Sequence, residues 1–70
     1  MILFKTAQYI QLKNPPEGVW GYFIKGYEYI DGELYLISGD ANMKHHINDV
    51  KENYSTYIIN LINKQENANN

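Results

Sequence analysis

Two adjacent histidines, His45 and His46, are the residues of this chain best suited to bind a metal ion or to move a proton. Asp40 and Asp49 lie nearby in sequence and are the available third ligands. Adjacent residues of a strand point to opposite faces of the sheet, so the two imidazoles would not readily reach one ion. We therefore expect no metal site, and we interpret the pair as a strand end with one packed ring and one solvated ring.

Nucleophiles and acid–base pairs are also sparse. The chain has no cysteine, and Ser38 and Ser55 lie in no recognisable nucleophile motif. The eight carboxylates are scattered singly, without the pairing that raises one pKa for general-acid work. Neither the P-loop nor the glycine spacing of a dinucleotide-binding motif occurs. These observations predict a protein that is not an enzyme and carries no cofactor.

Aromatic side chains are the remaining groups with binding chemistry. The 70 residues include seven Tyr, two Phe and one Trp, which is more than one sheet face and one helix are expected to bury. Exposed Trp and Tyr side chains are favoured anchors in protein interfaces. We predict that Trp20, Tyr22 and Tyr35 contact a protein partner. The sequence leaves open whether Trp20 belongs to the core instead.

Nucleic-acid binding is the alternative function, because bases stack on exposed aromatic rings of a sheet. Neutralising a phosphate backbone requires clustered Lys or Arg. Residues 1–47 contain four lysines against five carboxylates, the chain has no arginine, and its formal net charge is −2. We therefore favour a protein partner over a nucleic acid.

The strongest local pattern is a hairpin at residues 27–37, where two β-prone runs flank Asp31-Gly32, a pair typical of two-residue turns. The turn predicts four cross-strand pairs: Ile30 with Glu33, Tyr29 with Leu34, Glu28 with Tyr35, and Tyr27 with Leu36. One side of the hairpin should then face the core through Tyr27, Tyr29, Leu34 and Leu36. Tyr35 lies on the other, wetter side, which makes it the best candidate for an exposed aromatic.

Further strands are predicted at Thr6–Leu12, Gly18–Lys25 and Met43–Ile47. Gly26 marks a bend that joins the second of these to the hairpin. The spacing of Gly18, Gly21 and Gly26 loosely resembles the glycine-punctuated strands of SH3-like barrels.

A C-terminal helix is predicted from a capping box that begins at Asp49 and ends at Glu52. Its apolar face comprises Val50, Tyr54, Tyr57, Ile58, Leu61 and Ile62. Ile59 lies off this face. A symmetric homodimer through Ile59, or through strand addition at the Thr6–Leu12 edge, is therefore a further expectation.

These elements predict one α+β domain over residues 1–64 and a disordered tail over residues 65–70. The domain is either a small antiparallel sheet or a half-open SH3-like barrel, of four to five strands, with one C-terminal amphipathic helix. No basic leader precedes the N-terminal apolar run, and no apolar stretch reaches the roughly 20 residues of a membrane span. We expect a cytoplasmic protein without a membrane partner.

The composition also bears on the source of the chain. Asn, Ile, Lys and Tyr supply 31 of the 70 residues, a bias typical of AT-rich coding sequences. Together with the small size and the surplus of aromatic residues, this bias suggests a phage or mobile-element accessory protein. Our hypothesis is that it inhibits or redirects one bacterial host protein.

Overall fold

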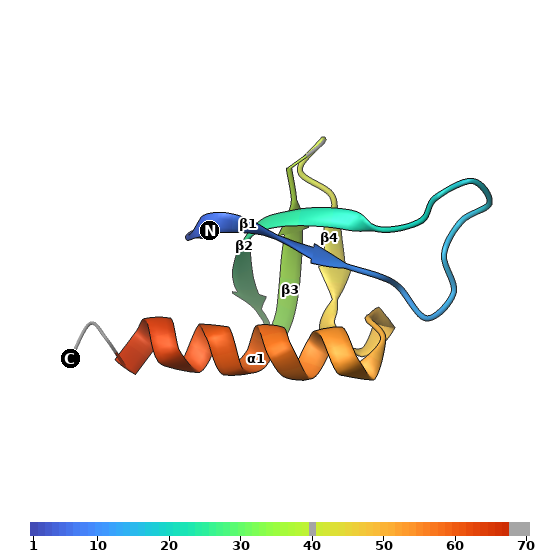
Figure 1. Cartoon of the computed structure of the whole chain (residues 1–70). Helices are drawn as coiled ribbons and strands as arrows, with labels where there is room; N and C mark the ends of the chain where they lie inside the picture. Colours follow the sequence, from blue (N-terminus) through green and yellow to red (C-terminus); the bar gives the residue numbers. More distant parts are fainter. Residues whose placement is uncertain (40, 68–70) are drawn as a thin grey trace.

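Four antiparallel strands and one C-terminal helix form the fold in a computed structural model that describes residues 1–39 and 41–67. The strands are β1 (Ile2–Ile10), β2 (Tyr22–Ile30), β3 (Glu33–Ser38) and β4 (Lys44–His46). A short 3-10 turn, η1 (Ile47–Asp49), leads to helix α1 (Glu52–Asn67). The sheet order is β1-β2-β3-β4, and α1 lies across one face of the sheet (Figure 1). The predicted α+β class is therefore confirmed.

The β2–β3 hairpin has the predicted turn and all four of the predicted pairs. Asp31 and Gly32 have φ angles of 52° and 80°, the positive values that this turn requires. Tyr27 and Leu36 are buried in the core, and Leu34 packs against it. The prediction for Tyr29 is wrong, because its side chain is mostly exposed near the tip of the hairpin.

β2 is one continuous strand that passes through Gly26, with an irregular register between Ile24 and Gly26. Gly26 pairs with Leu3 of β1, and a Cβ atom at this glycine would overlap the backbone carbonyl of Ile2. The predicted bend at Gly26 is thus a close approach of two backbones. The strand begins at Tyr22, so residues 18–21 belong to the preceding loop and not to the predicted strand.

Replacing Gly26 with alanine should separate β1 from β2 and lower the free energy of unfolding by about 1–3 kcal/mol, the usual cost of forcing an extra carbon into a packed site. Urea denaturation measures the change. Gly39→Ala is the matched control, because a Cβ there meets only the Phe23 carbonyl oxygen at 3.8 Å. Equal effects of the two substitutions would contradict the role given to Gly26.

β1 starts at Ile2, four residues before the predicted strand, because Phe4 supplies a buried ring to the core. Phe4 packs on Tyr27, with ring centroids 5.5 Å apart. The pairing of β1 with β2 is interrupted between Leu3 and Gln8, where β1 contains more residues than the facing part of β2. The outer edge of the sheet is therefore irregular along this strand.

The chain beyond β1 is fastened to the segment between η1 and α1. Leu12 and Val50 form an isolated antiparallel bridge. On either side of it, the Lys13 N–H donates to the Asp49 carbonyl at 2.8 Å, and the Lys51 N–H donates to the Gln11 carbonyl at 3.0 Å. β1 and β4 are not neighbours in the sheet, which is open. The two ends of the meander thus meet only at this bridge within the described residues, in place of a closed SH3-like barrel.

The bridge also explains why the predicted capping box is wrong. Val50 is extended, with φ −91° and ψ 139°, because it pairs with Leu12. The helix therefore cannot start at Asp49, and it starts at Glu52 instead. The carbonyl of Lys51 accepts hydrogen bonds from the Tyr54 and Ser55 amides and so begins the first turn.

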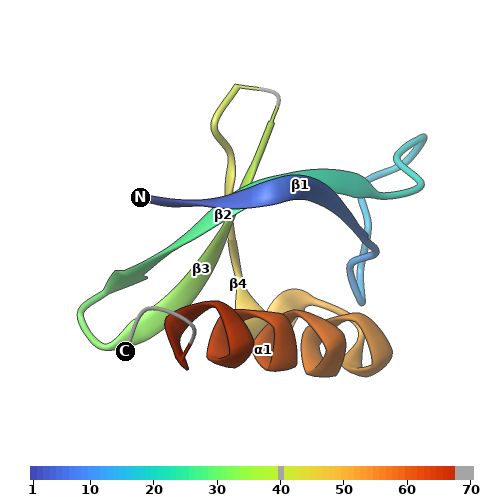
Figure 2. The same ribbon diagram turned by 60° about the vertical axis from the view of Figure 1, so that its left-hand side comes forward.

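The core lies between the sheet and the inner face of α1 (Figure 2). Ile58 and Ile62 are buried, and Tyr54 and Leu61 pack against the core, as the helical spacing predicts. Tyr57 is exposed, contrary to the prediction. The sheet contributes Phe4, Ile10, Ile24, Tyr27 and Leu36, and Val50 completes the cluster from the segment before the helix.

The helix continues to Asn67 and so includes residues 65–67, which belong to the predicted tail. Gln65 donates its side-chain amide to the Leu3 carbonyl at 3.3 Å, and the Tyr27 hydroxyl donates to Glu66 Oε1 at 3.2 Å. Burial, together with the Glu66 carboxylate, raises the pKa of Tyr27 to about 12. The rest of the predicted tail, residues 68–70, lies outside the described residues. No helix in the described ranges has the length and apolar character needed to cross a membrane.

Replacing Glu66 with alanine leaves the Tyr27 hydroxyl without its acceptor and should lower the free energy of unfolding by about 1 kcal/mol. In a Tyr27→Phe background the same substitution should have little effect, because the donor is already gone. Urea denaturation of the four proteins of this double-mutant cycle gives the coupling energy. A coupling energy near zero would contradict the contribution of this hydrogen bond to stability.

Candidate functional site

Three aromatic rings lie exposed around the loop between β1 and β2. The exposed fractions are 86 % for Trp20, 65 % for Phe23 and 39 % for Tyr9. The Tyr9 and Phe23 rings are in edge contact, with centroids 5.4 Å apart, and Tyr9 pairs directly with Phe23 in the sheet. We call Tyr9, Trp20 and Phe23 the aromatic surface.

The aromatic surface borders an open depression of about 560 Å³, lined by Tyr9 and by residues 18–23. The loop that carries Trp20 projects beyond the sheet (Figure 1, cyan). Two prolines, Pro15 and Pro16, restrict its first half, and Gly18 takes a positive φ of 82°. The Val19 N–H donates to the Pro16 carbonyl at 3.1 Å and closes a turn there. The local sequence therefore directs Trp20 away from the core.

Of the three residues predicted to contact a partner, Trp20 is on the surface, which answers the question that the sequence left open. Tyr22 is half-buried, packs against the core, and has its ring centroid 4.3 Å from that of His45. Tyr35 is half-buried on β3, and its ring meets His46 edge-on at 5.1 Å. Trp20 and Tyr22 both border the depression, whereas Tyr35 does not.

Tyr9 and Phe23 were not among the predicted partner contacts. Their position on one face follows from the register Tyr9↔Phe23 and Ile10↔Tyr22, which puts Ile10 in the core and Tyr9 on the other face. In β1 the alternation of Tyr9 with buried Ile10 was a usable signal for Tyr9. The pairing with Phe23 was not predictable, because the connecting loop is long and the register is irregular.

The predicted dimer contacts lie elsewhere. Ile59 is 39 % exposed on α1, next to buried Ile58. A depression of about 350 Å³ on the same helix is lined by Tyr57, Asn60, Leu61 and Lys64, and Ile59 is not part of it. Part of the Thr6–Leu12 edge is already covered, since Leu12 pairs with Val50.

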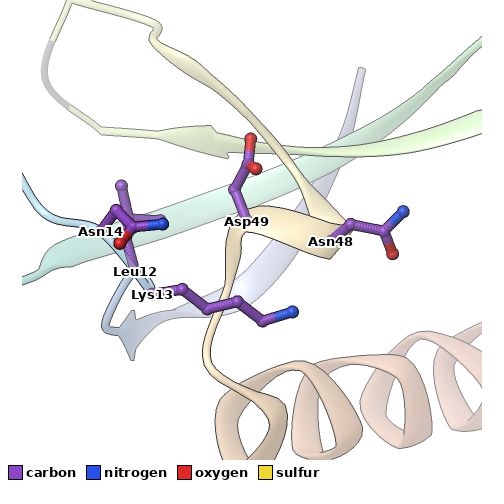
Figure 3. A pocket seen from close by; sticks show the side chains of 5 residues that line it. All are labelled: Leu12, Lys13, Asn14, Asn48 and Asp49. Carbon is purple, nitrogen blue, oxygen red and sulfur yellow. The ribbon is translucent and has the colours of Figure 1, made fainter.

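A smaller hollow of about 290 Å³ lies beside the bridge and is lined by Leu12, Lys13, Asn14, Asn48 and Asp49. The side chains of Lys13 and Asn48 point away from the Asp49 carboxylate (Figure 3). Asn14 lies on the other side of Asp49 from Asn48. These polar groups do not converge on a common point. The hollow therefore presents no preformed set of ligands for a small molecule or ion.

The two histidines have different surroundings, as expected for adjacent strand residues. His45 is buried, and no hydrogen bond to its Nε2 is present among the described residues. Burial lowers the pKa of His45, and the Asp49 carboxylate partly opposes this shift. His46 Nδ1 accepts a hydrogen bond from the Asn48 N–H at 3.0 Å, and its Nε2 lies 3.3 Å from Glu33 Oε2.

No group of three or more His, Asp or Glu side chains in the described ranges is arranged to hold a metal ion. Asp40, which the sequence offered as a third ligand, lies outside the described residues. Comparison of the chain with protein-family models, with curated proteins and with solved structures gives no match. The fold and the aromatic surface together define a small α+β domain with an exposed aromatic face.

The buried His45 should make the fold less stable in mild acid. Its pKa is lowered in the folded state, so the unfolded chain binds more protons as the pH falls below about 6.5. The contribution of neutral His45 to the free energy of unfolding is therefore complete above that pH. It is lost as the pH falls through the folded-state pKa. We expect a lower urea midpoint at pH 5.5 than at pH 7.5.

His45→Phe removes the titrating group and should flatten this dependence, whereas His46→Gln should leave it in place. An unchanged difference between pH 5.5 and pH 7.5 in His45→Phe would show that another group is responsible.

Proposed function

We propose that this chain is a small, non-enzymatic protein-binding domain whose partner contacts the aromatic surface. The observation that carries the proposal is the exposure of Trp20 and Phe23, which line the same depression. Covering these rings would remove a large apolar area from water, which is the main favourable term in protein association. Trp and Tyr are also enriched among the residues that dominate binding energy in interfaces.

The surroundings of the aromatic surface also support a protein partner. Gly18 leaves the depression without a side chain at that point, and a Cβ atom there would meet nothing within 4 Å, so an opposing chain can approach the backbone. Two lysines of the sheet, whose charge would attract a nucleic acid, are engaged by other side chains. Lys25 donates to the Asn42 side chain, and Lys44 pairs with Glu28 at 3.7 Å.

We further propose that the protein acts in the cytoplasm of a bacterial host, as a phage or mobile-element accessory factor that inhibits or redirects one host protein. The length of 70 residues and the bias toward Asn, Ile, Lys and Tyr support this part of the proposal. A single binding surface is sufficient for such a role, since blocking a host protein requires only that one face of it be covered.

Tyr22 and Tyr35 also stay predicted partner contacts, but their replacement by alanine should have different effects on stability and binding. Tyr22 packs against the core, so Tyr22→Ala should lower stability as well as binding. Tyr35 faces His46 away from the depression, and Tyr35→Ala should therefore weaken capture less than Trp20→Ala.

A tagged pull-down from a low-GC bacterial lysate, with and without nuclease, tests the proposal. Trp20→Ala and Phe23→Ala should each reduce the affinity for the retained protein, with at least about a tenfold loss for Trp20→Ala. Both side chains are exposed, so the urea midpoint should stay close to that of the unmodified chain.

Tyr57→Ala is the matched control, because Tyr57 is an exposed ring on α1 away from the loop. Capture that is unaffected by Trp20→Ala would refute the proposed surface. Recovery that disappears with nuclease would favour the nucleic-acid alternative instead.

A further inference from the structure

Tyr9 lies where four parts of the molecule meet. Its hydroxyl donates to the Trp20 carbonyl at 3.3 Å, and its ring contacts Phe23 of β2 and Tyr54 of α1, with centroids 5.4 Å and 6.0 Å away. The ring also lies against Gly21, where a Cβ atom would overlap it. Tyr9 therefore touches β2, the loop and the helix from its place on β1.

A chain of polar contacts continues from Tyr9 to the start of α1. The Gln11 side-chain amide donates to the Tyr9 hydroxyl at 3.3 Å, and Gln11 Oε1 accepts from Lys51 Nζ at 3.3 Å. The backbones of Gln11 and Lys51 are also joined, by the 3.0 Å hydrogen bond beside the bridge. The hydroxyl of Tyr9 is thus held by a segment that is itself fixed to the fold.

The loop segment that carries Trp20 has few attachments of its own. Within residues 14–21, all of which are described, the backbone hydrogen bond outside the strand pairing runs from the Val19 N–H to the Pro16 carbonyl, and it is internal to the loop. The Tyr9 hydroxyl is the polar contact that joins the Trp20 backbone to the sheet. Without it, Trp20 would be attached mainly through the chain on either side.

We infer that Tyr9 is a positioning residue, which holds the Trp20 segment against the sheet and so fixes the aromatic surface before a partner arrives. Ordering a segment in advance removes an entropic cost from binding, because the bound conformation is already populated. The importance of this positioning for binding rests on the function proposed above. The positioning itself does not, and it can be measured in the isolated protein.

Trp20 is the single tryptophan of the chain, so time-resolved fluorescence anisotropy reports its motion without a label. Tyr9→Phe keeps the ring and removes the hydroxyl. It should increase the amplitude of the nanosecond decay of Trp20 and leave the urea midpoint nearly unchanged. Gln11→Ala should act in the same direction through the loss of its contact with Tyr9.

Gly21→Ala should have a larger effect, because the added methyl group would overlap both the Tyr9 ring and the Ile10 carbonyl oxygen. Tyr57→Phe is the matched control, since it removes an exposed tyrosine hydroxyl on α1 that lies outside this network. Unchanged anisotropy in Tyr9→Phe and Gln11→Ala, both still folded, would overturn the positioning role.

The binding consequence is tested with the protein captured in the pull-down. Tyr9→Phe should weaken that interaction about three- to tenfold, the range expected when one side chain must be newly immobilised. If Tyr9→Phe increases the motion of Trp20 but leaves the affinity unchanged, the proposed effect of Tyr9 on binding is overturned. The role of Tyr9 in positioning Trp20 would still hold. If Trp20→Ala itself has no effect on capture, the proposed function fails, and the anisotropy result still decides the role of Tyr9.

Discussion

The pairing of residues 11–13 with residues 49–51 joins parts of the chain that lie far apart in sequence, and much of the fold follows from it. It holds Val50 extended and so delays the helix to Glu52. It brings Lys51 to Gln11 and, through Gln11, to Tyr9. The same pairing fixes one end of the loop that presents Trp20. An open meander is thereby held against its helix without closing into a barrel.

The small core explains why aromatic rings remain outside. One helix covers one face of the sheet, and the buried cluster is built from one or two side chains of each element, such as Phe4, Ile24 and Ile58. Tyr9 and Phe23 lie on the sheet face away from this cluster, and Tyr9 meets α1 through the edge contact of its ring with Tyr54. Their exposure is thus a consequence of the two-layer arrangement. Only Trp20 needs a projecting loop to reach the surface.

Local chemistry made the turn and the register of the hairpin predictable. Asp31-Gly32 determines a turn type, the turn determines the register, and the register determines the faces of Tyr27 and Tyr35. The bend at Gly26 was also predictable, because a glycine inside a β-prone run indicates a close backbone approach.

Features that depend on distant pairings were not predictable from the sequence. The predicted helix start was wrong because the bridge between Val50 and Leu12 prevents Asp49 from capping the helix, and this bridge cannot be read from the local sequence. The aromatic surface was found only in part, through Trp20, because Phe23 meets Tyr9 across an irregular register. Tyr29 was assigned to the core by its alternation alone, although the end of the hairpin leaves it uncovered.

The last turns of α1 hold contacts with the beginning of the chain, since Gln65 reaches Leu3 and Glu66 reaches Tyr27. During synthesis, the meander leaves the ribosome before the helix that covers it. The hairpin can form at once, because its contacts are local. The apolar face of the sheet, however, stays open until residues 58–66 have emerged. Translation therefore passes through a stage in which a nascent sheet exposes its inner face, and completion of the helix ends that stage.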